Sequence, residues 1–246
     1  MGNVAIIGGT GLTNLADLEI IRREVVQTPY GEPSGALTHG VLCGKDIVFI
    51  ARHGYGHTIP PHKINYRANL WALKHVGVER IIAIAAVGGI ASDFPPKKLA
   101  IPDQIIDYTW SRKNTFFEEG LEEVVHVDFT FPYDESLRQI LIQACQQAGV
   151  EYCDSGTYGA TQGPRLESAA EINRYERDGC TMVGMTGMPE AVLARELGMA
   201  YATCAVSVNW AAGRSENLIS MVDIERCLKE GMDGIRAMFA KLVPLL

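Results

Sequence analysis

The sequence predicts an α/β fold organised as a single domain over residues 1–246. Short apolar runs rich in β-branched residues alternate along the chain with segments whose apolar residues recur every three or four positions. The length of 246 residues and the hydrophobic content of 47% suffice for a sizeable core. Proline and glycine cluster at 29–35, 54–61 and 94–102, but none of these stretches is long or polar enough to be an interdomain linker.

The expected strands are apolar runs bounded by turn residues. In chain order they are VAIIGG (4–9), DIVFIAR (46–52), RIIAIAAVGG (80–89), IPDQIIDY (101–108) and YATCAVSVNW (201–210). The chain between these runs carries helical patterns, so strands and helices alternate as they do in α/β proteins.

Two helices are expected where apolar residues follow a period of 3.6, and both should pack on the sheet. The first set is Leu137, Ile140, Leu141, Ala144, Cys145 and Ala148, and the second is Ile224, Leu228, Ile235, Met238, Phe239 and Leu242. A third helix is expected from about 167 to 177. A fourth should begin near Pro189, which suits a first helical turn, with Glu190 complementing the positive end of the helix dipole.

Charge and cysteine content exclude several classes of protein. The net charge of −7 provides no basic face for a nucleic-acid backbone. The six cysteines lack CxxC spacing and favour a reducing compartment. No apolar run of 18 residues and no cleavable leader is found, so we expect a cytoplasmic protein without nucleic-acid or membrane partners.

Polar side chains that suit a small anion follow two of these strands and a further expected strand end at Val183 and Gly184. GGTGLT resembles the start of a dinucleotide-binding turn, but the long helix and the acidic strand end of that motif are missing, so Thr10 is better interpreted as a ligand of one small anion such as phosphate. Arg52 and His53 leave the second strand, and Met185 and Thr186 precede the fourth helix. Ligand sites of α/β proteins lie at such strand exits.

A zinc site at His53, His57 and His62 is the less favoured interpretation of the histidines. No nearby cysteine completes a ligand set, and the Pro60–Pro61 pair breaks any helix that would align the three imidazoles. We therefore expect no metal.

The motifs together resemble one family across nearly the whole chain. They are IIGGTGL, TPYGEPS, ARHGYGHTIPPHKINYRANLWALK, AAVGGI, QGPRLES, GMTGMPEAVLARELG and SVNWAAG. In this order they are similar to the trimeric purine nucleoside phosphorylases and methylthioadenosine phosphorylases, with NYRANLWALK and TPYGEPS closer to the methylthioadenosine branch. The resemblance implies a mixed β-sheet flanked by helices, a homotrimer, and phosphate-driven cleavage of a purine nucleoside without a metal or organic cofactor.

The resemblance also implies roles for individual residues. Positions that match phosphate contacts are Thr10, Arg52, His53, Ala86 and Thr186; His57 and Met185 match ribose contacts; Val87, Gly88, Leu166, Glu167 and Asn209 match the purine pocket. In that scheme Asn209 steadies the leaving base while Arg52 and His53 hold the nucleophile. His126 is the candidate that a neighbouring subunit would contribute.

Three positions depart from the family pattern. Leu166 replaces an aromatic residue, Ala85 replaces a polar residue of some members, and Ala211 replaces an aspartate of methylthioadenosine phosphorylases. For the 5′ end of the substrate, the apolar Met221 and Ile224 suit a methylthio group.

Glu167 and Asn209 predict the choice of base. A 6-oxopurine offers an acceptor at O6 and a donor at N1, which a carboxamide and a carboxylate satisfy, whereas adenine offers the opposite pair. We therefore expect a substrate of the 5′-methylthioinosine type. A methylthioadenosine phosphorylase, an inosine/guanosine phosphorylase and a non-catalytic nucleoside- or phosphate-binding protein remain as alternatives.

Overall fold

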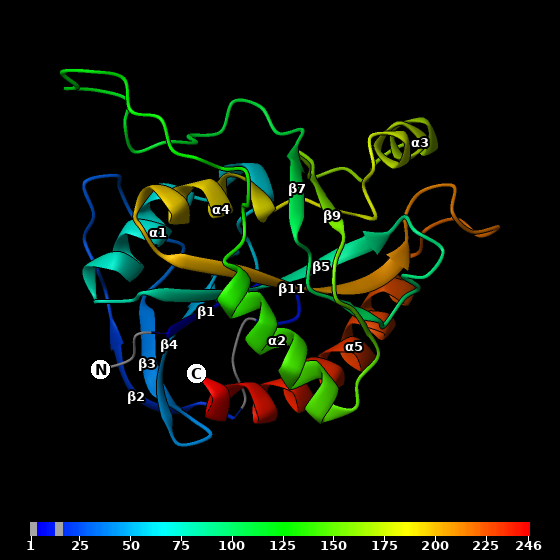
Figure 1. The fold of residues 1–246 in the computed structure, drawn as a ribbon, viewed down its shortest axis with the longest axis horizontal. Coiled ribbons are helices and arrows are strands. Elements are labelled where there is room, and N and C mark those ends of the chain that lie inside the picture. The colour runs from blue at the N-terminus through cyan, green and yellow to red at the C-terminus, as the bar shows by residue number, and fades with distance from the viewer. Residues whose placement is uncertain (1–3, 13–16) are drawn as a thin grey trace.

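A computed structural model describes residues 4–12 and 17–246, so Thr13, the last residue of GGTGLT, lies outside the described residues. The elements are drawn in Figure 1. In chain order they are β1 (Val4–Gly8), β2 (Glu19–Glu24), β3 (Leu37–Leu42), β4 (Lys45–Ala51), η1 (Pro61–Lys63), α1 (Tyr66–His75), β5 (Arg80–Gly89), β6 (Leu99–Ala100), β7 (Gln104–Asp107), α2 (Glu135–Ala148), β8 (Tyr152–Cys153), β9 (Thr157–Ala160), α3 (Ala169–Arg177), β10 (Met182–Gly184), α4 (Gly187–Glu196), β11 (Ala200–Trp210), α5 (Met221–Leu242) and η2 (Val243–Leu245).

The predicted α/β class and its main elements are confirmed. The five apolar runs form β1, β4, β5, β7 and β11, and the two periodic segments form α2 and α5. The third helix begins at Ala169, slightly later than expected, because Ser168 and Glu171 form a reciprocal capping box that fixes the first turn there. Strands β2, β3, β6, β8 and β9 and helix α1 were not predicted. Of these, β6 and β8 have two residues each, too few to carry a periodic pattern.

The sheet is mixed. Within the described residues, its main path runs β2-β3-β4-β1-β5-β10-β9-β7, while β11 pairs with β5 and β6 and β8 extends from β6. β1 is parallel to β4 and β5, and β11 is parallel to β5 along the whole length of β5. β10 is antiparallel to β5 and parallel to β9. The chain direction therefore reverses between β5 and β10.

This reversal leaves an opening beside β5. β1 pairs with residues 80–83 of β5, and β10 pairs with residues 88 and 89. In the part of the chain that the structure describes, residues 84–87 have β11 as their strand partner on one side and no paired strand on the other. Ligands of α/β proteins bind in a crevice of this kind, where neighbouring strands diverge.

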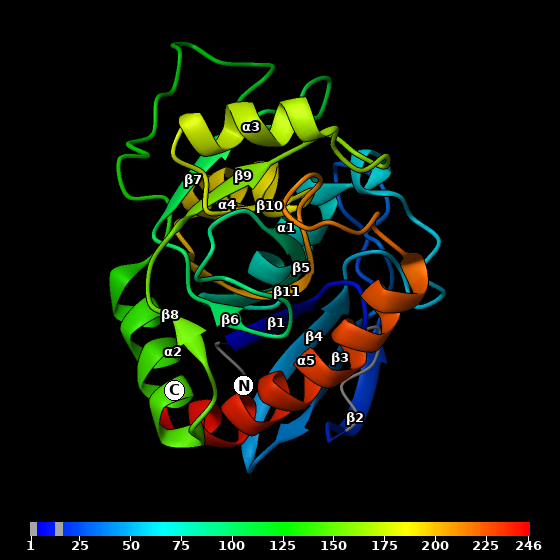
Figure 2. The same cartoon turned by 90° about the vertical axis from the view of Figure 1, so that its right-hand side faces the viewer.

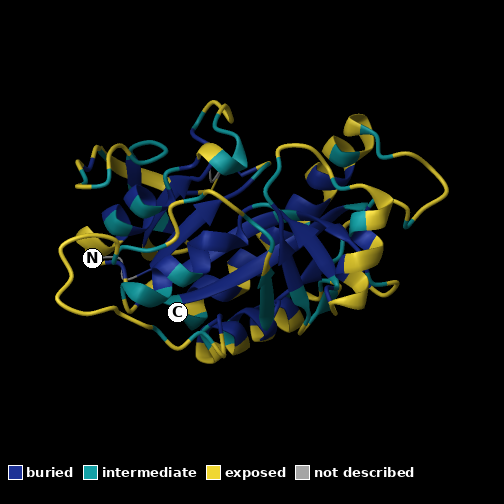
Figure 3. Ribbon diagram, turned by 90° about the horizontal axis from the view of Figure 1, so that it is seen from above, coloured by how far each residue is buried: buried dark blue, intermediate teal, exposed yellow. Residues whose placement is uncertain are grey.

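Helices cover both faces of the sheet (Figure 2). α1 and α4 pack on one face through residues such as Leu73 and Leu193, and α2 and α5 pack on the other through residues such as Leu141 and Ile235. The strands between them are largely buried, and exposed residues lie along the outward sides of the helices (Figure 3). Among the described residues, no helix combines the length and the apolar character that crossing a membrane requires.

Candidate active site

A cavity of about 240 Å³ opens along the free side of β5. Its walls come from the ends of β1, β4, β5, β9, β10 and β11 and from the start of α5. The predicted site residues that line it are Thr10, Arg52, His53, Ala86, Val87, Gly88, Leu166, Glu167, Met185, Thr186, Asn209, Met221 and Ile224. Segments far apart in the sequence thus meet at one place.

His57 and His126 do not line this cavity. The backbone of His57 is left-handed, with φ of 51°, and its exposed imidazole lies 3.2 Å from the Thr10 hydroxyl and edge-on to His53. The expected ribose contact of His57 is therefore not part of the cavity wall, because the turn places its ring behind Thr10 and His53. His126 is exposed on the connection between β7 and α2.

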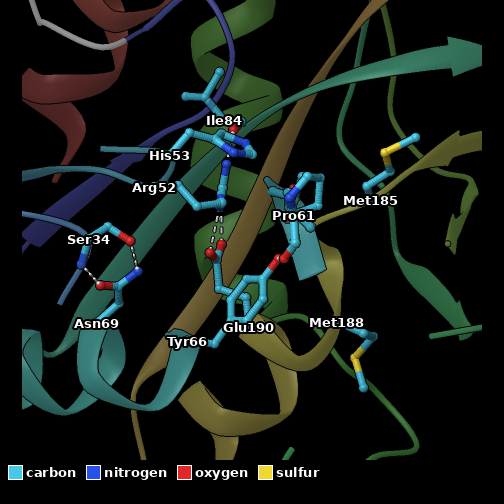
Figure 4. A network of polar contacts seen from close by, with 12 residues as sticks. Ser34, Arg52, His53, Pro61, Tyr66, Asn69, Ile84, Met185, Met188 and Glu190 are labelled. Carbon is cyan, nitrogen blue, oxygen red and sulfur yellow. Dashed lines mark hydrogen bonds and ion pairs between the residues drawn. The ribbon is translucent and has the colours of Figure 1, made fainter. Parts of the chain in front are cut away.

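Arg52 lines the cavity, but its planar fork is occupied. Its side chain is 1% exposed, and Nε and Nη2 donate to the two oxygens of Glu190 at 2.6 and 2.7 Å. Nη1 donates to the carbonyl of Ile84 at 2.9 Å (Figure 4). The sequence predicts an anion next to Arg52, but the two parallel hydrogen bonds of its fork are made to Glu190, because this carboxylate is buried and needs a cation.

The ion pair between Arg52 and Glu190 determines the net charge at this part of the cavity wall. Burial alone disfavours the charged guanidinium, but the Glu190 carboxylate holds the pKa of Arg52 above its ordinary value. Glu190 also accepts a hydrogen bond from the hydroxyl of Tyr201 at 2.8 Å. The opposite charges of Arg52 and Glu190 cancel, so the pair adds no net charge to the anion site. The donors that Nη1 and Nη2 still have can face an anion.

His53 has a defined tautomer. Its Nδ1 lies 2.8 Å from the carbonyl of Ile59, which can only accept, so Nδ1 carries the proton and Nε2 keeps its lone pair. Burial, together with the charge of Arg52, lowers the pKa of His53 to about 4. At neutral pH the cavity therefore contains a neutral imidazole whose Nε2 can accept a hydrogen bond from a hydroxyl group.

Thr186 and Met185 lie where β10 turns into α4. The Thr186 side chain is buried and makes no capping hydrogen bond to α4, so its hydroxyl is not consumed by the helix start. The regular helix begins after Met188, whose backbone is extended, and Glu190 pairs with Arg52 instead of acting on an exposed helix dipole. Gly163 has φ of 61°, and a Cβ there would lie 2.4 Å from the sulfur of Met185. This glycine therefore lets the thioether pack close to the chain after β9.

Glu167 and Asn209 stand at the other end of the cavity. The hydroxyl of Thr161 donates to Oε1 of Glu167 at 2.6 Å, so the carboxylate is held as an acceptor with Oε2 left over. Nδ2 of Asn209 donates to the carbonyl of Trp210 at 2.7 Å, which leaves the amide oxygen and one N–H for a ligand. An irregularity in the pairing of β11 with β5 between Ser207 and Asn209 sets this amide at the cavity.

Sequence reasoning missed three residues that shape the site. The sequence pattern assigned Glu190 to a helix dipole and gave no role to Thr161 or Arg112. A carboxylate followed by Ala191, Val192 and Leu193 on a buried helix was a signal for Glu190, because an unpaired buried carboxylate is rare. Nothing in the sequence pattern pointed to Arg112, which lies on an irregular connection.

Comparison with known proteins agrees with this geometry. The phosphorylase superfamily profile matches residues 3–243. A protein from Pseudomonas syringae pv. tomato named probable S-methyl-5′-thioinosine phosphorylase is 51% identical over 239 residues, or 97% of each chain. The 6-oxopurine nucleoside phosphorylase of Pyrococcus furiosus is 47% identical over 251 residues, covering 100% of this chain and 94% of that protein.

A solved structure shares the fold. Methylthioadenosine phosphorylase from Schistosoma mansoni in complex with adenine superposes with a TM-score of 0.94 and 32% identity, covering 98% of this chain and 91% of that one. The predicted mixed sheet flanked by helices is therefore confirmed, as is the resemblance drawn from the motifs. With a match along nearly its whole length and full-length relatives at about half identity, this chain belongs to the phosphorylase superfamily.

Proposed function

We propose that this protein cleaves S-methyl-5′-thioinosine with inorganic phosphate, yielding hypoxanthine and 5-methylthioribose 1-phosphate. The observation that carries this choice is the pair of polar groups at the base end of the cavity, Glu167 and Asn209. The names of the relatives from Pseudomonas syringae and Pyrococcus furiosus support a 6-oxopurine substrate. The reaction needs phosphate as co-substrate and neither a metal nor an organic cofactor.

The hydrogen bond from Thr161 to Glu167 favours a 6-oxopurine. Oε1 of the Glu167 carboxylate accepts from the hydroxyl of Thr161, which orients the group, and Oε2 is left as an acceptor that suits the N1–H of hypoxanthine. Adenine would set the lone pair of its N1 against the carboxylate. A mispaired buried polar group costs about 1–3 kcal/mol, enough for a clear preference between the two bases.

Asn209 stabilises the leaving base by hydrogen bonds. As the bond between C1′ and N9 breaks, electrons move into the purine and N7 becomes basic. The free amide oxygen of Asn209 can accept the N7–H of the protonated base, while its remaining N–H serves O6. Phosphate attacks C1′ from the opposite face of the ribose, and the proton that it carried balances the proton that the base gains.

Phosphate is held at the end of the cavity away from the base. It is bound there by neutral hydroxyl donors and by Arg52, whose charge Glu190 compensates. The hydroxyls of Thr10 and Thr186 and the remaining N–H groups of Arg52 face the nucleophile, and Nε2 of His53 accepts from a protonated phosphate oxygen. No side chain forms a covalent bond to the sugar. Catalysis consists of positioning and electrostatic stabilisation.

The 5′ end of the nucleoside faces an apolar wall at the start of α5. Met221 and Ile224 line the cavity there, and Met221 is 63% exposed in this single chain. A methylthio group suits such a wall better than a hydroxyl does, because a hydroxyl would lose hydrogen bonds to water.

A homotrimer would cover this open wall. Apolar side chains are exposed beside the cavity at Leu218, Met221 and Val222, and further ones, including Trp110 and Phe131, lie on the connection 108–134. Exposed apolar groups in such numbers mark interaction surfaces. We expect sedimentation velocity to show a trimer at assay concentrations. An active monomer would contradict this assembly and the role of His126.

One assay separates the candidate functions. The protein is incubated with methylthioinosine, methylthioadenosine, inosine or adenosine, with and without phosphate, and the free base is measured. Phosphate-dependent release that is fastest from methylthioinosine supports the proposal. Preference for methylthioadenosine or for inosine supports those alternatives, and binding without release of base supports a non-catalytic binding protein.

A further inference from the structure

Arg112 binds backbone groups at two strand ends of the site. It lies on the connection between β7 and α2 and is half-buried. Nη2 donates to the carbonyls of Thr161 and Gln162 at 3.0 and 2.8 Å, just after β9. Nη1 donates to the carbonyls of Met185 and Met188 at 2.8 and 2.6 Å, on either side of the turn from β10 into α4.

The remaining contacts of Arg112 engage the last N–H donor of its guanidinium. Nε donates to Oε1 of Gln162 at 3.1 Å, and Nη1 also lies 3.3 Å from the hydroxyl of Tyr66. A guanidinium has five N–H donors, so protein acceptors engage all of them. Arg112 is also not among the residues that line the cavity. Its role is therefore distinct from that of Arg52, which keeps donors for an anion.

The residues that bear these carbonyls, and their neighbours in the chain, take part in the proposed reaction. Thr161 holds Glu167, and Met185 and Thr186 face the ribose and the phosphate. Four carbonyls from two separate segments converge on one cation, and without that cation they would repel one another and require other donors. The paired strands β9 and β10 and the hydrogen bond from the amide of Thr161 to the carbonyl of Gly184 join the two segments up to this point. Beyond that pairing, the four carbonyls that Arg112 binds join the chain after β9 to the turn into α4.

We propose that Arg112 is a positioning residue that fixes the end of β9 relative to the turn from β10 into α4, and so sets the distance between the base and ribose subsites. It also ties these subsites to the connection 108–134, which carries the exposed apolar residues proposed above to contact a neighbouring subunit. This role in the reaction rests on the proposed function, whereas the structural tie itself does not.

The test compares Arg112→Ala and Arg112→Lys with Arg67→Ala. Arg67 is a matched control because it also holds the connection 108–134, through Glu118 and the carbonyl of Thr115, without reaching either strand end. We measure kcat and KM for methylthioinosine and for phosphate, and amide hydrogen exchange in 161–167 and 184–188. Each measurement is repeated with free guanidinium well below denaturing concentrations.

Arg112→Ala should lower kcat/KM for methylthioinosine about 100-fold, the loss typical of a misplacement of about 1 Å. Exchange in both segments should rise, and guanidinium should restore part of the activity and of the protection. Arg112→Lys should remain impaired because an ammonium group has only three donors. Arg67→Ala should stay within about threefold of the parent, a smaller loss than misplacement causes.

The proposal is overturned if Arg112→Ala and Arg112→Lys keep parental kinetics, if Arg67→Ala loses as much activity as they do, or if guanidinium restores neither activity nor protection. A parent without activity on any of the four nucleosides would instead refute the proposed function. Hydrogen exchange would in that case still decide whether Arg112 holds the two segments together.

Discussion

Replacing Glu190 by glutamine tests whether Arg52 faces the anion while being paired on its other side. Both side chains are almost completely buried, and both carboxylate oxygens contact the guanidinium. Glutamine retains the shape and one acceptor oxygen but removes the negative charge. Arg52→Ala is a poorer test, because it would leave Glu190 as an uncompensated buried charge.

The expected loss of stability follows from the burial of the pair. Breaking a buried ion pair by removing one partner costs about 3–5 kcal/mol, and the retained acceptor places Glu190→Gln near the lower value, about 3 kcal/mol. The free energy of unfolding is measured by urea denaturation. Glu230→Gln is the control, because it removes the same charge from the exposed pair with Lys97, where water and salt screen the interaction, and should leave the free energy of unfolding almost unchanged.

Glu190→Gln should bind phosphate more tightly than the parent, although the variant is less stable. Without Glu190, Arg52 carries an uncompensated charge that an anion in the cavity can neutralise. Two unit charges about 6 Å apart at an effective dielectric constant of about 20 interact by about 3 kcal/mol, so after relaxation a gain of about 1–3 kcal/mol is reasonable. This corresponds to phosphate binding roughly 5- to 150-fold tighter, measured by calorimetry.

Turnover should nevertheless fall, since the orientation of Arg52 is no longer fixed by two hydrogen bonds from its fork. Phosphate affinity that is unchanged or weaker in folded Glu190→Gln would refute the assignment of Arg52 to the anion site. An equal gain in Glu230→Gln would show that the effect comes from the overall charge of the protein.

Two further predictions concern the base and the imidazole. Asn209→Asp should lower kcat/KM for methylthioinosine roughly 10- to 100-fold and raise the relative rate for methylthioadenosine. Full conversion to methylthioadenosine should require Glu167→Gln as well. If the ratio of kcat/KM for the two nucleosides does not change, these residues do not select the base. The pKa of His53 is lowered from 6.5 to about 4, so the stability that its neutral form contributes is fully present above about pH 6.5 and is lost as the pH falls towards 4. That contribution is about 3 kcal/mol, and His53→Gln should flatten the dependence of the unfolding free energy on pH in this window; an equally steep dependence in the variant would assign it to other groups.

Much of the framework follows from local sequence patterns. Strands β1, β5 and β11 are long apolar runs, and α2 and α5 carry periodic apolar stripes, so burial of apolar surface specifies them almost independently of context. The polar residues at the strand ends, from Thr10 to Thr186, were expected near one another because strand exits converge in an α/β sheet. The residues of the purine pocket were expected from the family resemblance instead. The apolar wall at Met221 was expected because apolar residues stand near the start of the last helix.

Only the tertiary structure decided how the charged groups of the site are partnered. Arg52 and Glu190 are 138 residues apart, and Arg112 meets carbonyls 49 to 76 residues away. Backbone carbonyls have no signature in a sequence, and a guanidinium can donate to a phosphate, to a carboxylate or to peptide carbonyls. Which acceptor each arginine meets depends on where strands reverse direction, and the reversal between β5 and β10 is set by packing across the whole sheet.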